Sequence, residues 1–529
     1  MASKHILPIV VLFLSLVSYS FAQPTTSDDL CKKTVNPYFC RSNLPRNASW
    51  DLYDYSHFSF RQSFSVSKTL SFSMTKYLKK LSKLPISSIR ALNDCKELAE
   101  LNMDFLSKTM GTLKSKKSSI NGLQSQDMQA LLSAIVTNQQ TCLDGLQRYS
   151  SAWNATSDLH TPMYDGNKMY SLSLALFRNA WGKRWNGAKE MFAKNDISRK
   201  RIIHAYLRGV HVNNSVVVNP DGTGDFTTIT DAINAAPNNT DISNGYHVIF
   251  VVAGVYEEYV NVVKNKMNIM MIGDGINRTV ITGNRSAGDG WTTFNSATFI
   301  VVGQGFVGVD MTIQNTAGAI KFQAVALRNG ADMSTFYRCS FEGYQDTLYT
   351  HSLRQFYREC DIYGTVDFIF GNAAVVLQNC NIYPTLPIHG QRNEITAQGR
   401  TDPNQNTGTS IQNCNIRASE ALASSNDTTQ TYLGRPWKEY SRVVYMQSFM
   451  DSLIVPPGWD IWSGDFALAT LFYAEYNNKG PGSDTTNRVT WPGYHVIDTI
   501  AATNFTVSNF IAGDAWLPQT GVPYTGGLI

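Results

Sequence analysis

The chain repeats itself at an interval of about 20 residues, and cysteines mark the repeat. Cys339, Cys360 and Cys380 are 21 and 20 residues apart, and a similar motif begins at Cys414. A period of this length is typical of a solenoid, in which equivalent residues stack on neighbouring coils. Short β-rich runs punctuated by Gly and Asn predict that residues 211–529 form a right-handed parallel β-helix. A β-sandwich, the alternative, does not explain residues that repeat in step.

Two aspartates share this repeat. Asp346 lies seven residues after Cys339, and Asp367 lies seven residues after Cys360. On stacked coils the two carboxylates face the same side and lie close enough to couple. Coupled carboxylates can divide the roles of acid and nucleophile, because like charges separate their pKa values. The pair is therefore a candidate catalytic centre.

Further polar residues accompany this pair. Gln323 precedes Asp346 by 23 residues, about one coil, and Gln345 is adjacent to Asp346. Asp367 lies in an apolar stretch, where a carboxylate needs a cation or strong donors to remain ionised. Arg435 is the natural candidate, and the ring of Trp437 could lie along a sugar. Taken alone, each Gln is better explained by a structural ladder on the β-helix, so the combination carries the prediction.

The N-terminus has the pattern of a secretory signal peptide, which we place at residues 1–22. Lys4 and His5 precede an apolar stretch, and Ser20–Ala22 offers a small-residue cleavage site. The alternative is a membrane anchor, but the stretch is shorter than the ~20 residues that a span needs. Export leads to an oxidising compartment, where disulfides persist.

Residues 27–183 have the pattern of a helical bundle. Apolar residues recur at spacings of three and four through 58–81, 86–110 and 123–146, which predicts about four antiparallel helices. Cys31 and Cys40 are expected to close a small hairpin, and Cys95 and Cys142 could join two helices. No cysteine–histidine spacing indicates a metal site, and no cofactor motif is present.

The two halves of the chain differ in charge. Residues 1–210 hold 28 Lys and Arg against 14 Asp and Glu, whereas residues 211–529 hold 17 against 27. A basic block joined to an acidic block predicts mutual attraction, unless both are independent solvated surfaces. Between them, at 184–210, the tract Ser198-Arg-Lys-Arg-Ile-Ile203 reads as a processing site for a secretory protease or as a solvated linker.

These motifs resemble those of plant pectin methylesterases. The resemblance covers roughly 211–529 and rests on five segments: Gly254-Val-Tyr-Glu-Glu258, Gln323-Ala-Val-Ala-Leu327, Tyr344-Gln-Asp-Thr-Leu348, Asp367-Phe-Ile-Phe-Gly371 and Leu433-Gly-Arg-Pro-Trp437. The N-terminal region is similar to the pectin methylesterase inhibitor family, a four-helix bundle. The tandem resembles a precursor whose inhibitor-like segment is removed during export.

The resemblance implies a role for each site residue. Asp367 is implied as the nucleophile that attacks the C6 methyl ester of galacturonate, and Asp346 as the general acid and then base. Gln323 and Gln345 are implied as hydrogen-bond donors to the oxyanion, and Arg435 as the residue that orients the nucleophile. The implied substrate contacts are Gln323, Arg435, Trp437, Tyr349 and Phe370. The implied substrate is methyl-esterified homogalacturonan of the extracellular cell wall, with no metal, cofactor or nucleic acid.

The resemblance also implies a bridge between Cys380 and Cys414, which leaves Cys339 and Cys360 as partners on adjacent coils. Eight Asn-x-Ser/Thr sequons are candidate glycosylation sites: Asn47, Asn154, Asn213, Asn238, Asn277, Asn284, Asn426 and Asn504. Two other readings remain open. One is a pectate lyase or polygalacturonase on the same fold, and the other is a non-catalytic inhibitor or wall-binding protein that acts through residues 27–183.

Overall fold

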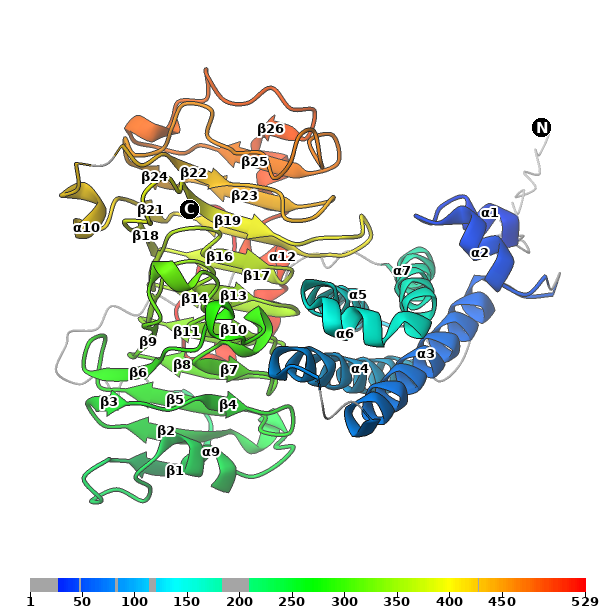
Figure 1. The fold of residues 1–529 in the computed structure, drawn as a ribbon, viewed down its shortest axis with the longest axis horizontal. Helices are drawn as coiled ribbons and strands as arrows, with labels where there is room; N and C mark the ends of the chain where they lie inside the picture. The colour runs from blue at the N-terminus through cyan, green and yellow to red at the C-terminus, as the bar shows by residue number, and fades with distance from the viewer. Residues whose placement is uncertain (1–26, 47–48, 81–83, 114–119, 183–208, 427) are drawn as a thin grey trace, which may run out of the picture.

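The computed structural model describes residues 27–46, 49–80, 84–113, 120–182, 209–426 and 428–529 of the 529-residue chain. A bundle of helices stands beside a long stack of parallel strands (Figure 1). The predicted signal peptide and nearly all of the predicted linker at 184–210 lie outside the described residues. Within those residues, no helix is both long and apolar enough to cross a membrane.

The N-terminal part is an all-helical bundle, as predicted. Its long helices pack as neighbouring pairs, α3 with α4 and α7, and α5 with α4 and α7. The helices of this part are α1 (Ser27–Cys31), α2 (Pro37–Asn43), α3 (Leu52–Lys80), α4 (Ile86–Thr112), α5 (Gly122–Arg148), α6 (Ser150–Ala155) and α7 (His160–Trp181). The predicted disulfides Cys31–Cys40 and Cys95–Cys142 are both formed, and the second joins α4 to α5.

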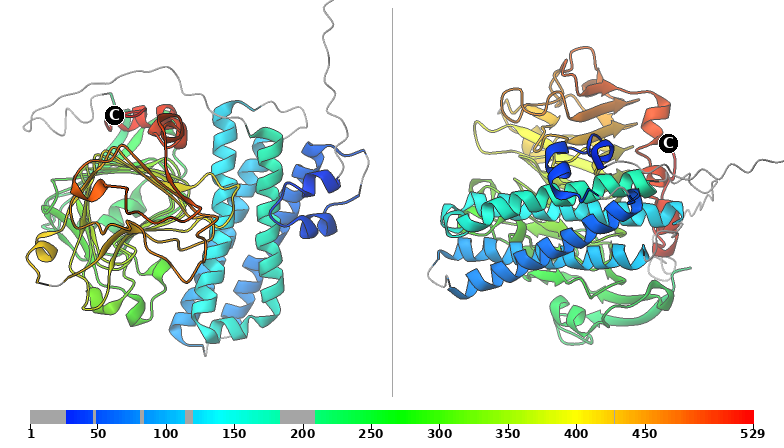
Figure 2. Two further views of the ribbon diagram at one scale, coloured as in Figure 1. Left: turned by 90° about the horizontal axis from the view of Figure 1, so that it is seen from above. Right: turned by 90° about the vertical axis from the view of Figure 1, so that its right-hand side faces the viewer.

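Helix α5 lies between the bundle and the β-helix. It begins with a capping box, in which the side chains and backbone amides of Asn121 and Gln124 pair reciprocally. Every residue from 131 to 139 is buried. A helix that is buried all round has packing partners on opposite faces, and Figure 2 shows the bundle standing against one side of the β-helix. This helix therefore carries much of the contact between the two domains.

Residues from Val212 onward form three parallel sheets. One sheet has the order β1 (Val212–Val218), β2 (Tyr246–Val251), β5 (Ile269–Gly273), β8 (Val307–Val309), β11 (Ser334–Tyr337), β14 (Arg354–Arg358), β17 (Ala374–Gln378), β20 (Gly408–Gln412), β23 (Arg442–Met446), β25 (Phe472–Tyr476) and β26 (Tyr494–Val496). The second has the order β24 (Phe449–Met450), β21 (Asn415–Ile416), β18 (Asn381–Pro384), β15 (Asp361–Gly364), β12 (Ser340–Glu342), β9 (Thr312–Asn315), β6 (Thr279–Gly283) and β3 (Gly254–Tyr256).

The third sheet faces the bundle and carries the candidate site. Its order is β22 (Thr431–Gly434), β19 (Asn393–Gln398), β16 (Ile369–Gly371), β13 (Leu348–Thr350), β10 (Leu327–Asn329), β7 (Phe299–Val301) and β4 (Val260–Val262). Short helices border the β-helix: α9 (Ile229–Ala235), α10 (Glu420–Ala423), α11 (Thr499–Thr503) and α12 (Val507–Phe510).

The strands stack in register, so that each coil repeats the one before it. Leu327 pairs with Leu348, and Leu348 pairs with Ile369. All three side chains are fully buried in one apolar core. Inward apolar residues from successive coils thus form a continuous column. Stacking the coils buries apolar surface that no single coil could bury alone. The parallel β-helix predicted from the period is confirmed.

The predicted disulfides of the β-helix are wrong. Cys339, Cys360, Cys380 and Cys414 are buried, unbridged thiols on successive coils. Neighbouring strands stand about 4.8 Å apart with parallel Cβ directions, whereas a disulfide needs Cβ atoms about 3.5–4.5 Å apart. Each thiol also contacts backbone carbonyl oxygens, as in the 3.5 Å contact from Cys360 Sγ to the carbonyl oxygen of Phe336 on the preceding coil.

Candidate active site

The two aspartates of the repeat stand on adjacent coils, as predicted. Leu348 pairs with Ile369, and Asp346 and Asp367 each lie two residues before these partners. Both have positive φ, 65° and 53°, in a region that non-glycine residues adopt rarely and that often marks functional sites. This turn directs both side chains out of the core and into a cleft along the third sheet.

Arg435, on the loop after β22, holds Asp367 with two parallel hydrogen bonds. Its Nε and Nη2 atoms each donate to one carboxylate oxygen at 2.8 Å. The guanidinium also lies over the ring of Trp462, 4.7 Å from its centroid. A bidentate arginine fixes both the charge and the orientation of a carboxylate. Asp367 is therefore prepared as an ionised group despite its burial.

The electrostatics of the two aspartates differ. Burial, and then the charge of Asp367, raise the pKa of Asp346 well above its usual value. Burial also raises the pKa of Asp367, but the hydrogen bonds and charge of Arg435 oppose this. Asp346 has no cation of its own at hydrogen-bonding distance among the described residues. One carboxyl group is thus suited to carry a proton while its neighbour is held as the anion.

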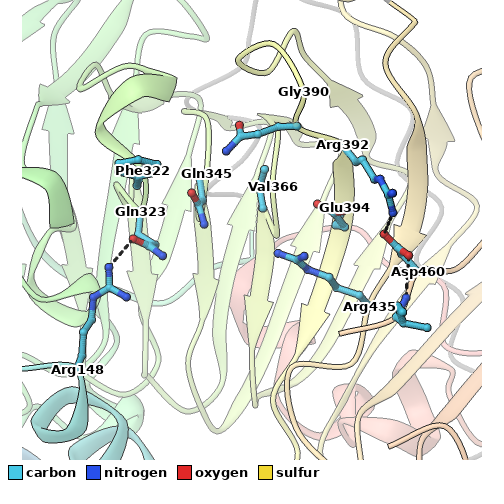
Figure 3. A pocket seen from close by; sticks show the side chains of 12 residues that line it. Arg148, Phe322, Gln323, Gln345, Val366, Gly390, Arg392, Glu394, Arg435 and Asp460 are labelled. Atoms are coloured by element: carbon cyan, nitrogen blue, oxygen red, sulfur yellow. Dashed lines mark hydrogen bonds and ion pairs between the residues drawn. The ribbon is translucent and has the colours of Figure 1, made fainter. Parts of the chain in front are cut away.

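Gln323 and Gln345 border the same cleft, on the coils of β10 and β13. Together with Val366, Glu394 and Arg435 they line a pocket of about 620 Å³ (Figure 3). Both amides are half-buried at the edge of the sheet. Amide groups in such positions can donate hydrogen bonds to an anionic oxygen that forms in the cleft. A neighbouring pocket is lined by both glutamines, both aspartates and Arg435, so the structure brings together all five residues predicted as catalytic.

The aromatic residues predicted to contact substrate lie deeper, against the bundle. The rings of Tyr349 and Phe370 stack 4.2 Å apart, and Trp437 lies edge-on to Phe370 at 6.1 Å. These rings pack in one apolar cluster with bundle residues such as Leu146. A second pocket of about 640 Å³ is lined both by these aromatic residues and by the end of α5. The bundle thus covers the part of the cleft that could bind sugar.

One carboxyl group of this site, Glu394, was not predicted from the sequence. Ile369 pairs with Thr396, so Glu394, two residues earlier, occupies the position that corresponds to Asp367 on the next coil. Asp367 therefore has a carboxyl neighbour on either side. The period gave no signal for Glu394, because it follows Asp367 by 27 residues rather than 21.

The ion pairs between the domains have the opposite polarity to the net charges of the two domains, whose overall attraction stays a prediction. Four ion pairs between the described parts of the two domains place the acid on the bundle and the cation on the β-helix: Glu97–Arg328, Asp104–Lys264, Asp127–Arg354 and Asp144–Lys438. Bundle cations instead reach neutral acceptors, as Arg90 does at the carbonyl oxygen of Gly290. Local pairing, rather than net domain charge, therefore defines this interface.

Comparisons with known proteins identify the family of each domain. A family model described as Pectinesterase matches residues 215–514, and one described as Plant invertase/pectin methylesterase inhibitor matches residues 25–176. "Probable pectinesterase/pectinesterase inhibitor 20" of Arabidopsis thaliana is 53% identical over 98% of this chain and 96% of its own length. Pectinesterase 2 of Citrus sinensis is 48% identical over 83% of this chain and 82% of its own length.

A solved structure extends the similarity to three dimensions. The pectin methylesterase from carrot is 55% identical and superimposes with a TM-score of 0.58, covering 59% of this chain and 98% of its own. The fold and the comparisons define a carboxylic ester hydrolase with an inhibitor-type helical domain. The chain belongs to the pectinesterase family.

Proposed function

We propose that this chain hydrolyses the C6 methyl esters of homogalacturonan, with Asp367 as the nucleophile. The observation that carries the proposal is the bidentate contact of Arg435 with Asp367, beside a second carboxyl group on the preceding coil. The carboxylate of Asp367 attacks the ester carbonyl, and the tetrahedral intermediate collapses to an anhydride as methanol leaves. Arg435 keeps the attacking group charged where burial alone would protonate it.

Asp346 acts first as the general acid and then as the general base. Its raised pKa keeps it protonated when the ester binds, so it donates a proton to the departing methoxide. The resulting carboxylate then takes a proton from water, which attacks the anhydride carbonyl. This second step releases the product as galacturonic acid, which loses its proton to the surrounding water, restores Asp367 as an anion and leaves Asp346 protonated for the next cycle.

The two glutamines stabilise the charge that forms between these steps. Gln345 borders the cleft beside Asp346, and Gln323 borders it on the preceding coil. Their amide groups donate to the oxyanion of each tetrahedral intermediate, and removal of one such donor costs about 3–4 kcal/mol in other acyl-transfer enzymes. Trp437, Tyr349 and Phe370 provide the apolar surfaces on which the sugar rings lie.

The bundle acts as an internal inhibitor of this cleft. It covers the aromatic surface and places Arg148 in the pocket, where it contacts Gln323. Activity then requires that the bundle at 27–183 separates from the β-helix at 211–529. We assign this step to cleavage at the basic tract in 184–210, after the signal peptide at 1–22 has directed the chain to the secretory route. The product acts on pectin in the cell wall.

Methanol release tests this proposal directly. The full chain and the 211–529 segment are compared on methyl-esterified pectin, each with and without Asp367→Asn. We expect the segment to release methanol faster than the full chain, and the substitution to abolish release in both. Formation of unsaturated or reducing ends without methanol would instead show a lyase or a glycosidase. A 211–529 segment that releases no methanol would instead favour a non-catalytic binding protein.

A further inference from the structure

Glu394 is a carboxyl group of the cleft to which the proposed reaction gives no role. It lies on β19, next to the coil of Asp367, and only 3% of its surface is exposed. Figure 3 shows it among the residues that line the pocket, between Val366 and Arg392 and beside Arg435. A buried carboxyl group in a substrate cleft is costly unless it has a partner or a function.

The cations around Glu394 are already paired. Arg435 is engaged by Asp367, and Arg392 forms a 2.9 Å ion pair with Asp460. Within the described residues, no side chain or backbone amide donates a hydrogen bond to the Glu394 carboxyl group. The charged and titratable groups that face it are Asp367, Arg435, Arg392, Asp460 and Tyr432. Burial, opposed only partly by Arg435, raises the pKa of Glu394 to about 8. At neutral pH it therefore presents a hydroxyl donor to the pocket.

The pocket is longer than a single ester group requires. Its lining residues come from five successive coils, from Gln323 beside β10 to Arg435 after β22. Four strand spacings of about 4.8 Å give a length of about 19 Å. A chain of several sugars can lie along it, with Asp367 near the middle. Glu394 then stands one coil beyond the reacting ester, on the side away from Asp346.

We propose that Glu394 determines which sugar the enzyme accepts next to the ester that it cleaves; this rests on the function proposed above. The protonated carboxyl group donates a hydrogen bond to the uronyl group of that neighbouring unit, whether it is a methyl ester or a free acid. The ionised group repels a neighbouring carboxylate but not a neutral ester. Glu394 thus makes the enzyme tolerate de-esterified neighbours at neutral pH and reject them at alkaline pH.

The test compares inhibition by product at two pH values. Full-length wild type, Glu394→Gln and Glu394→Ala are produced in a plant secretory host and assayed in the form that the host releases. Methanol release from highly methylated pectin is measured with added polygalacturonate at pH 6.5 and pH 9, after subtraction of alkaline hydrolysis without enzyme. Glu342→Gln, on β12 and outside this pocket, is the matched control. Circular dichroism at both pH values confirms that each variant is folded.

We expect the inhibition constant of wild type and of Glu342→Gln to rise about tenfold between the two pH values, as a charge-assisted contact is lost and repulsion replaces it. Glu394→Gln keeps a donor without a charge, so its constant should change less than twofold. Glu394→Ala should bind polygalacturonate weakly at both. Asp346 and Asp367 contribute equally in every variant, so the difference between variants isolates Glu394.

Two results would overturn the proposal. An equal rise in wild type and Glu394→Gln would show that the pH dependence comes from other groups. Equal loss of activity and of polygalacturonate binding in Glu394→Gln, at both pH values, would show a purely structural role. A wild-type preparation that releases no methanol would contradict the proposed function itself. This outcome can be told apart from the other two, because both of them require an active wild type.

Discussion

Arg148, in the last turn of α5, donates a hydrogen bond of 3.2 Å to the side-chain oxygen of Gln323 (Figure 3). The two residues are 175 positions apart in sequence and belong to different domains. The guanidinium also lies near enough to Asp346 to lower its pKa slightly against the effect of burial. A cation of the bundle is therefore hydrogen-bonded to an amide that is proposed to bind the oxyanion.

Substitution of this arginine should release part of the inhibition. Arg148→Ala removes a contact in the pocket and leaves the aromatic cover in place, so we expect a several-fold rise in methanol release by the uncleaved chain. Arg61→Ala, an exposed arginine of α3, is the matched control and should change nothing. Equal activity of both variants and wild type would show that Arg148 does not limit access to the cleft.

The ion pairs between the domains should differ in strength. Arg354 is 3% exposed and binds both Asp332 of its own domain and Asp127 of the bundle, whereas Lys264 and Asp104 are each 52% exposed. We expect Asp127→Asn to weaken association of separated bundle and β-helix by about 1–3 kcal/mol, and Asp104→Asn by less than about 1 kcal/mol. Titration calorimetry measures both. A larger effect at Asp104 would contradict this ranking.

Association of the domains should depend on pH through Asp94 of α4. Burial raises the pKa of Asp94 to about 7, with Thr292, Asn295, Glu97 and Arg328 around it. Separation returns this carboxyl group toward its ordinary value near 4, so association takes up a proton between these values. Association should therefore weaken as pH rises toward 7, by at most about tenfold per pH unit from this group.

A second buried group at the interface acts in the opposite direction. Burial lowers the pKa of His351 to about 3, and the ring contacts Thr141 of the bundle at 3.0 Å. Its release of a proton on association favours binding at higher pH. The informative measurement is therefore the ratio of dissociation constants of wild type and Asp94→Asn, which should rise from pH 5 to pH 7. A constant ratio would show that Asp94 is already ionised in the complex.

The catalytic pair should be separable from other carboxyl groups of the β-helix. Asp367→Asn and Asp346→Asn should each lower the rate of methanol release by roughly three orders of magnitude without loss of the fold. Asp361→Asn is the control. Asp361 also has a raised pKa, but it lies on the second sheet, away from the cleft, where it accepts a hydrogen bond from Asn381. Near-normal turnover of either folded site variant would contradict its assigned role.

The cysteines should react in two groups. Non-reducing peptide mapping should find Cys31–Cys40 and Cys95–Cys142 as bridges. The four thiols of the β-helix should resist alkylation in the folded protein, because they are buried in its core, and react fully after denaturation. Detection of a Cys380–Cys414 bridge in the secreted protein would show that the coils shift enough to bring their Cβ atoms together.

The repeat in the sequence determined the fold and the centre of the site. A coil of constant length returns the chain to the same place, so equal spacing of Asp346 and Asp367 was sufficient to stack them. The bundle could also be predicted from the sequence, because its apolar spacing matches the helical period. Helix α4 begins at the residue predicted, Ile86. These features depend on local periodicity, which a linear sequence displays directly.

The tertiary structure alone decided what surrounds that centre. Glu394 joins the column only because the segment before β19 makes its coil longer, and Arg148 enters the pocket only because the bundle docks on this face. Net charge did not indicate the ion pairs at the interface either, since Asp127 and Arg354 associate with a polarity opposite to the overall charge of their domains. Contacts between rigid domains depend on the shape and position of a few side chains, and neither periodicity nor composition records these.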